Sequence, residues 1–133
     1  MTKEYFVKSA RKTAKARAVI KKGTGKISVN NTPIDVFYTG YKLDLAKEPI
    51  FLAEDDFNNY NCEINVNGGG VMGQMQAVRS CLAKGILATS KNKKAMKIKF
   101  KKYNKSLLSD PRQKESKKQL GTGARKKKQH SKR

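Results

Sequence analysis

Residues 63–88 encode a strand, a glycine turn and a helix in succession, and this stretch constrains the fold more than any other. Ile64 and Val66 alternate with polar residues, which is the period-two pattern of a half-buried strand. The run Gly68-Gly69-Gly70 then ends the strand. Beyond it, apolar residues recur at the three- and four-residue spacing of one helix face: Val71, Met75, Val78, Leu82 and Ile86.

The glycine turn is compatible with two roles. Successive glycines can bring backbone N–H groups close to an anion at the positive end of a helix, so the turn can hold a phosphate. Alternatively, the glycines only let helix and strand pack closely. A dinucleotide site is disfavoured although Gly68, Gly70 and Gly73 match the G-x-G-x-x-G spacing, because no acidic residue follows about 20 positions later to bind a ribose. The chain is also too short for a doubly wound sheet with a substrate domain.

The net charge of the chain limits its function. Its 133 residues hold 31 Lys and Arg against 10 Asp and Glu, a formal charge of +21. A compact fold with this charge repels itself unless a polyanion surrounds it, and nucleic acid is the first candidate. An anionic membrane surface is the second, but no apolar run approaches the roughly 18 residues of a spanning helix, and no signal peptide is apparent. We therefore expect a single cytoplasmic domain.

The positive charge lies outside the middle of the chain. Residues 27–90 hold four basic and seven acidic residues, whereas residues 1–26 hold nine basic residues and one acidic residue. Residues 91–105 hold eight basic and no acidic residues, and residues 106–133 hold ten and two. This distribution predicts a nearly balanced globular centre with cationic flanks. We divide the chain into a body, residues 1–105, and a C-terminal tail, residues 106–133.

The N-terminal half predicts further strands and short helices. Tyr5 to Ile20 should form two strands, the second with alanines on a buried face and Lys15 and Arg17 on a cationic one. Lys21–Lys26 should be a hairpin loop into a strand over Ile27–Val29, and it does not match a phosphate-binding P-loop. Asn30 and Asn31 should form a turn.

Helices are expected on both sides of the central stretch. Thr32 and Pro33 suit the N-cap and first position of a helix over Ile34–Tyr38. Tyr41–Asp55 should be partly helical, with a second segment beginning near Pro49, and Asp55–Asn61 should be a polar loop. Lys91–Tyr103 predicts a lysine-rich helix in which Phe100 and Tyr103 pack.

The C-terminal residues, from Asp110 onward, carry no folding signal. Leu120 is their only large aliphatic residue, so they cannot bury enough apolar area to offset their ordering entropy, and alone they should be disordered. Such a tail can follow a nucleic-acid backbone. A solubilising or localisation tail is the alternative.

No catalytic or metal-binding constellation is apparent. Cys62 and Cys81 are too few and too far apart for a disulfide framework, and we expect both to be core thiols. The acidic run of residues 54–56 has no spaced ligand series after it. His130 is the only histidine and lies in the tail, so a nucleophile–histidine pair would require the tail to fold back onto the body. We expect no enzyme, metal, cofactor or small-molecule substrate.

Short motifs along nearly the whole chain resemble the universal S-nine family of the small ribosomal subunit. They are, in order, Arg11-Lys12-Thr13-Ala14 with Ala16-Arg17, Gly23-Thr24-Gly25-Lys26, Glu48-Pro49, Gly68-Gly69-Gly70 with Gly73-Gln74, Ala77 and Arg79, Asp110-Pro111-Arg112 with Glu115, Lys117 and Lys118, Gly123-Ala124-Arg125, and Gln129-His130-Ser131-Lys132-Arg133. Val71-Met72-Gly73-Gln74 and Leu107 to Arg112 are similar to the archaeal and eukaryotic branch. Two departures stand out: the Ser-Lys-Arg ending is more like bacterial members, and Asn104-Lys105 stands where Asp-Arg is usual.

The resemblance implies an α/β (α+β) body like the second domain of the fifth small-subunit protein: a mixed four-stranded sheet backed by helices, with a long basic C-terminal extension. It also implies a structural role in the small ribosomal subunit, with the body on the 3′ major domain of the rRNA in the head, beside neighbouring head proteins. The tip of the tail would reach the anticodon stem-loop of the peptidyl-site tRNA.

The residues expected to contact RNA are mostly cations and glycines. For rRNA they are Arg11, Lys12, Lys15, Arg17, Lys22, Lys26, Gly68, Gly69, Gly70, Gln74, Arg79, Arg112, Lys117, Lys118, Arg125, Lys126, Lys127 and Lys128. For the tRNA, the resemblance implies Ser131, Lys132 and Arg133. A DNA-compacting protein is the competing binding function, and it would bind duplex DNA at least as tightly as rRNA.

Overall fold

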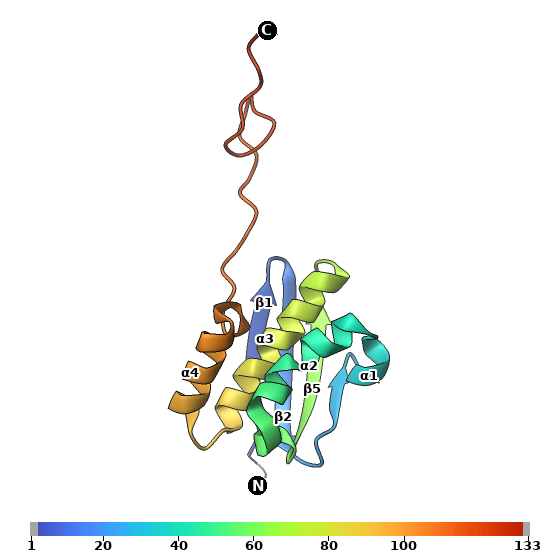
Figure 1. Cartoon of the computed structure of the whole chain (residues 1–133). Coiled ribbons are helices and arrows are strands. Elements are labelled where there is room, and N and C mark those ends of the chain that lie inside the picture. The colour runs from blue at the N-terminus through green and yellow to red at the C-terminus, as the bar shows by residue number, and fades with distance from the viewer. Residues whose placement is uncertain (1–2, 132–133) are drawn as a thin grey trace.

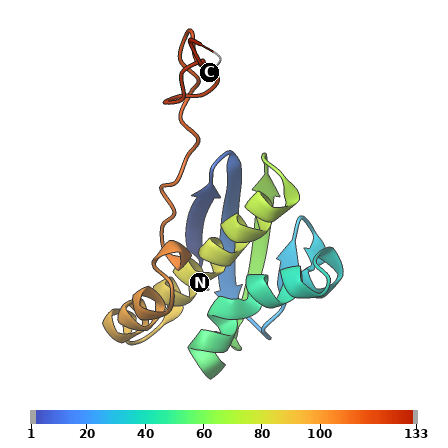
Figure 2. The same ribbon diagram turned by 45° about the horizontal axis from the view of Figure 1, so that its top comes forward.

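The computed structural model describes residues 3–131 and shows a mixed sheet with helices packed on one of its faces (Figures 1 and 2). The strand order is β1-β2-β5-β3-β4. The elements are β1 (Tyr5–Arg11), β2 (Ala14–Lys22), β3 (Ile27–Val29), β4 (Thr32–Pro33), α1 (Ile34–Phe37), α2 (Tyr41–Ala53), the 3₁₀ turn η1 (Glu54–Phe57), β5 (Tyr60–Asn67), α3 (Val71–Thr89), α4 (Lys93–Tyr103) and the 3₁₀ turn η2 (Lys105–Leu107).

The α+β class is confirmed, but the sheet has five strands rather than the expected four. The added strand is β4; the prediction of Thr32 as N-cap and Pro33 as first residue of a helix is wrong, because both residues pair with β3 and Pro33 is the N-cap of α1. Asn30 and Asn31 both adopt positive φ, +49° and +65°, which is what a type I′ hairpin turn requires. The turn therefore folds Thr32 and Pro33 back against β3, and Pro33 is tolerated because β4 is an edge strand.

The connection from β2 to β3 is not the predicted hairpin. β5 lies between them, antiparallel to β2 and parallel to β3. β5 pairs with β2 over eight residues, from Lys15↔Asn67 to Lys22↔Tyr60, whereas β3 offers only three residues. The longer ladder satisfies more backbone groups, so the loop that includes Gly23–Lys26 crosses the end of β5 instead.

The core lies between the sheet and α3, the longest helix. Ala14, Ala16 and Ala18 of β2 are at most 2 % exposed, and their small side chains let α3 approach closely. Phe100 of α4 is fully buried, as predicted, whereas Tyr103 is half exposed. Cys62 and Cys81 are buried free thiols, which confirms their assignment to the core. Burial raises the pKa of both, that of Cys81 to about 11.

α2 is one continuous helix, so the predicted break near Pro49 is wrong. A proline inside a helix removes one i→i−4 hydrogen bond, which normally disfavours it. Pro49 is fully buried, and the packing of its ring offsets that loss. η1 and the early start of β5 at Tyr60 likewise shorten the predicted polar loop over Asp55–Asn61.

Beyond η2 the chain leaves the body as a long extension (Figure 1). It contains no helix or strand within the described residues, but residues 121–127 close a loop through an isolated bridge between Gly121 and Lys127. The Thr122 amide donates to the Lys126 carbonyl at 3.0 Å. This loop was not predicted; the disorder of the free tail stays a prediction. No helix in residues 3–131 is long and apolar enough to span a membrane.

Candidate nucleic-acid interface

The glycine turn packs against the tip of the β1–β2 hairpin. Gly68 and Gly69 have φ of +75° and +67°. A Cβ on Gly68 would lie 2.6 Å from the carbonyl oxygen of Thr13, and one on Gly69 would lie 3.1 Å from the amide nitrogen of Ala14. The turn therefore needs glycine for close packing, the second of the two roles considered above.

The same geometry leaves the start of α3 open to an anion. Gly70 is the N-cap residue and has no atom within 4 Å of its would-be Cβ, no side chain caps the helix, and its first turn holds no acidic residue. The Gln74 side chain instead donates to the carbonyl of Gly68 at 3.2 Å. The positive end of the helix is thus exposed beside the hairpin tip, where Lys12 is also exposed. The packing role and a phosphate-binding role are compatible.

Arg11, predicted to contact rRNA, instead forms an ion pair and hydrogen bonds within the protein. Its Nε lies 3.0 Å from an Asp110 carboxylate oxygen and 2.8 Å from the Gln76 side-chain oxygen, and its Nη1 donates to the carbonyl of Arg112 at 3.1 Å. Only 12 % of the Arg11 side chain is exposed. These contacts hold the start of the extension against the hairpin and α3, at the end of the body where the glycine turn lies (Figure 1).

Asp110 is held ionised in this cluster. Its carboxylate, 6 % exposed, accepts two side-chain hydrogen bonds from Arg112, at 2.9 and 2.7 Å. The hydrogen bonds from Arg112, opposed by burial and aided by the charge of Arg11, lower the pKa of Asp110 to about 2.

Protonation of Asp110 is therefore expected to weaken the anchorage of the extension. Because the folded-state pKa is below that of a free aspartate, about 3.9, the stabilisation is complete above pH 4 and is lost as the pH falls through about 2. Carboxyl-carbon NMR shifts should give Asp110 a midpoint near 2. In the Arg112→Gln variant the midpoint should rise toward 3.9, and an unchanged midpoint would contradict the assigned cause.

Arg79, a second predicted rRNA contact, points between helices. Its guanidinium forms an ion pair with Glu48 of α2, whose other oxygen accepts a hydrogen bond from the Tyr103 hydroxyl of α4 at 3.1 Å. The Arg79 side chain is 11 % exposed. The hydrogen bond to Glu48 raises the pKa of Tyr103. Arg79 thus joins α2, α3 and α4, and the structure does not bring it to the glycine turn.

The remaining predicted contacts fall into three places. Lys15 and Arg17 are exposed on the sheet face that carries no helix. Lys22 and Lys26 lie at the opposite end of the body from the glycine turn, because the register places Lys22 beside Tyr60, at the other end of β5 from Asn67. The others are exposed in the extension, where Arg125 forms two hydrogen bonds with Glu115: Arg112, Lys117, Lys118, Arg125, Lys126, Lys127, Lys128 and Ser131. Lys132 and Arg133 lie outside the described residues.

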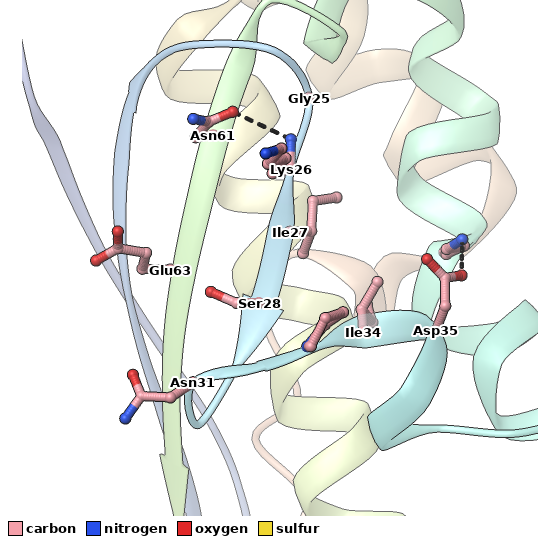
Figure 3. Close-up of a pocket in the computed structure, with 11 residues that line it drawn as sticks. Gly25, Lys26, Ile27, Ser28, Asn31, Ile34, Asp35, Asn61 and Glu63 are labelled. Carbon is pink, nitrogen blue, oxygen red and sulfur yellow. Dashed lines mark hydrogen bonds and ion pairs between the residues drawn. The ribbon is translucent and has the colours of Figure 1, made fainter.

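A hollow of about 690 Å³ lies near Lys26, along β3 and β4 (Figure 3). The Asn61 side-chain oxygen accepts hydrogen bonds from the amides of Thr24 and Lys26, at 2.8 and 3.1 Å, which fixes the loop. The carboxylates of Asp35 and Glu63 line this hollow. Its mixed charge does not extend the cationic surface. No cluster of three or more potential metal-binding side chains occurs among the described residues.

Four residues that were not among the predicted contacts share the open sheet face with Lys15 and Arg17. These are Phe6, Lys8, Asn65 and Asn67. The period-two alternation of β1 and β5 could have placed them on one face or the other. The pairing of β1 with β2 places Phe6 and Lys8 on this face, and the pairing of β2 with β5, which the sequence did not indicate, places Asn65 and Asn67 there.

The fold and its surface define a small basic protein with an open helix N-terminus beside an exposed lysine and with a basic extension. Residues 9–133 match the family Ribosomal protein S9/S16. The protein named small ribosomal subunit protein uS9 from Methanothrix thermoacetophila is 44 % identical over 122 residues, covering 91 % of this chain and 92 % of that one. Its namesake from Thermoplasma volcanium is 41 % identical with the same coverage, and that from Picrophilus torridus is 38 % identical over 130 residues, covering 96 % and 97 %.

The chain therefore belongs to the ribosomal protein S9/S16 family. This confirms the resemblance drawn from the motifs. It also confirms that the chain is not an enzyme, because the family is non-enzymatic. The archaeal relatives agree with the archaeal and eukaryotic features of Val71 to Gln74.

Proposed function

We propose that the chain is a structural constituent of the small ribosomal subunit that binds rRNA of the head, in the 3′ major domain, among neighbouring head proteins. Its extension would carry Ser131, Lys132 and Arg133 to the anticodon stem-loop of the peptidyl-site tRNA. Family membership supports the ribosomal location. The observation that supports the rRNA contact is the open N-terminus of α3, which lies beside the exposed Lys12 at the hairpin tip.

The chemistry of this end suits an RNA backbone. The first N–H groups of α3 point out of the helix, where they can donate to phosphate oxygens, and Lys12 adds an exposed positive charge. Because A-form RNA hides its base edges in a deep groove, contacts of this kind recognise shape and backbone more than sequence.

The extension suits a path between RNA segments. We retain residues 1–105 as the body and 106–133 as the tail. The lysines of the tail would neutralise phosphates and release counterions, and this would offset the cost of ordering the chain. Arg125 can also form a bidentate contact with a phosphate or stack on a base, provided that it exchanges its exposed partner Glu115 for RNA.

Cosedimentation tests the proposal. The epitope-tagged full chain should migrate with small subunits and polysomes through a high-salt sucrose gradient prepared from its own cells. Recovery at the top of the gradient would contradict the ribosomal role, and recovery with the nucleoid would favour a general polyanion binder such as a DNA-compacting protein.

Deletion of Ser131–Arg133 should weaken binding of peptidyl-site tRNA to otherwise intact small subunits at least about tenfold, since one hydrogen bond to a charged group contributes about 1.5–3 kcal/mol and about 1.4 kcal/mol corresponds to tenfold. Filter binding of tRNA to purified subunits measures this. The control is the Lys42→Gln, Lys91→Gln double variant, which removes two exposed lysines of the body that are not among the predicted contacts and should leave tRNA affinity unchanged. Equal affinity of the deletion variant and the unmodified chain would refute the tRNA contact.

A further inference from the structure

The sheet has one face without helices, and three rows of side chains cross it. α2 and α3 cover the opposite face (Figures 1 and 2). The register of β1, β2 and β5 defines the rows on the open face: Ala10, Lys15 and Asn67; Lys8, Arg17 and Asn65; Phe6, Val19 and Glu63. The first row lies next to the glycine turn, because Gly68 follows Asn67.

The two rows nearest the glycine turn are cationic. They contain three positively charged side chains and two amides but no carboxylate, whereas Glu63 stands in the third row. In the next row away from the glycine turn, Glu4 forms an ion pair with Lys21 at 3.2 Å. Within residues 3–131, the side chains of the cations and amides in the first two rows form no hydrogen bond or ion pair, so their positive charges and amide groups are available to a ligand: Lys8, Lys15, Arg17, Asn65 and Asn67.

An aromatic side chain borders these cations. Phe6 is 75 % exposed, and strand pairing places it diagonally across from Arg17. A hollow of about 430 Å³ opens there, lined by Phe6, Arg17, Val19 and Asn65 among others. A large exposed aromatic ring on a sheet face beside unpaired cations is the arrangement on which nucleic-acid bases stack.

We propose that this face binds unpaired nucleotides of RNA, with one base stacked on Phe6. Lys8, Lys15 and Arg17 neutralise the phosphates, and the amides of Asn65 and Asn67 can donate to and accept from base edges. A duplex keeps its bases stacked inside and would leave the Phe6 ring without a partner. The inference rests on the proposed function in taking RNA as the partner, but it adds a site separate from the start of α3.

Tryptophan fluorescence tests the stacking directly, because the chain contains no Trp. In the full-length Phe6→Trp variant, single-stranded oligouridine should quench the emission of the only indole. The matched control is Phe51→Trp, since Phe51 is 66 % exposed on α2, which packs on the opposite face. Its emission should not change. Absence of quenching at position 6, or equal quenching at both positions, would overturn the proposal.

The affinity for oligouridine and its salt dependence distinguish base stacking on Phe6 from phosphate contacts by the cations. Phe6→Ala should weaken oligouridine binding about tenfold without changing the slope of log K against log salt, since stacking involves no charge. Arg17→Gln should reduce that slope by about 0.7, the value for one phosphate contact to a single strand. If Phe6→Ala leaves the affinity unchanged, the stacking site is refuted.

The cosedimentation experiment separates a failure of the stacking proposal from a failure of the proposed ribosomal function. If the unmodified chain cosediments with small subunits but position 6 is not quenched, the ribosomal role stands and the sheet face has no RNA base on it. If the indole emission of Phe6→Trp within particles shifts to shorter wavelength and the shift survives complete ribonuclease digestion, a protein covers this face and the proposal is wrong.

Discussion

Replacement of Arg79 by Met should lower the free energy of unfolding by about 3 kcal/mol, because it leaves the Glu48 carboxylate without its charged partner between three helices. Both side chains are largely buried, at 11 % and 21 % exposed. Methionine keeps most of the volume and the helix propensity of arginine, so the loss should reflect the charge. Urea unfolding followed by circular dichroism measures it.

The Lys99–Glu54 pair provides a matched control. It also joins α4 to the end of α2, but its side chains are 45 % and 77 % exposed. Lys99→Met should therefore change the free energy of unfolding far less than Arg79→Met does. The Glu48→Gln, Arg79→Met double variant should recover part of the loss, since no unpaired carboxylate remains. A stable Arg79→Met single variant would show that Arg79 does not hold the helices together.

Gly68→Ala should destabilise the protein by about 3 kcal/mol. A left-handed backbone conformation costs an L residue about 1–2 kcal/mol, and an overlap forced into a packed region costs about 1–3 kcal/mol. Both apply here, because φ is +75° and the new methyl group would meet the backbone oxygen of Thr13, which cannot rotate away. Denaturant midpoints at constant slope measure the change.

Gly70→Ala is the control for Gly68→Ala. Its φ is −100° and open space surrounds the site, so only the poorer N-cap propensity of alanine remains, and the change should cost less than about 1 kcal/mol. Similar losses at both positions would mean that the turn tolerates no side chain for some reason other than backbone conformation and contact with the hairpin.

The local patterns of this chain predicted its elements better than their pairing. The alternation at Ile64 and Val66 and the helical spacing from Val71 to Ile86 both correspond to observed elements, β5 and α3. These patterns depend on each residue and its near neighbours. The position of β5 between β2 and β3 depends on which long ladder satisfies the most backbone groups, and no short stretch carries that information.

For the predicted site as well, local patterns predicted exposure but not contacts between distant residues. Exposure of Lys15 and Arg17 followed from alternation alone. The engagement of Arg11 and Arg79 within the protein could not be foreseen, because their partners Asp110 and Glu48 are far away in sequence. The exposure of Phe6 could not be predicted, because the sequence alone does not distinguish an exposed phenylalanine from a core phenylalanine. The distinction depends on how β1 pairs in the sheet.

The central position of β5 also sets an order for folding during synthesis. During synthesis of this chain, the β1–β2 hairpin and the β3–β4 hairpin emerge before β5. The edges of β2 and β3 that pair with β5 therefore have no neighbour until residues 60–67 emerge. The alanine face of β2 stays uncovered until α3 follows. A nascent chain stalled before residue 60 therefore exposes the two strand edges that β5 would pair, together with an apolar face, and such a chain is prone to aggregate or to recruit a chaperone.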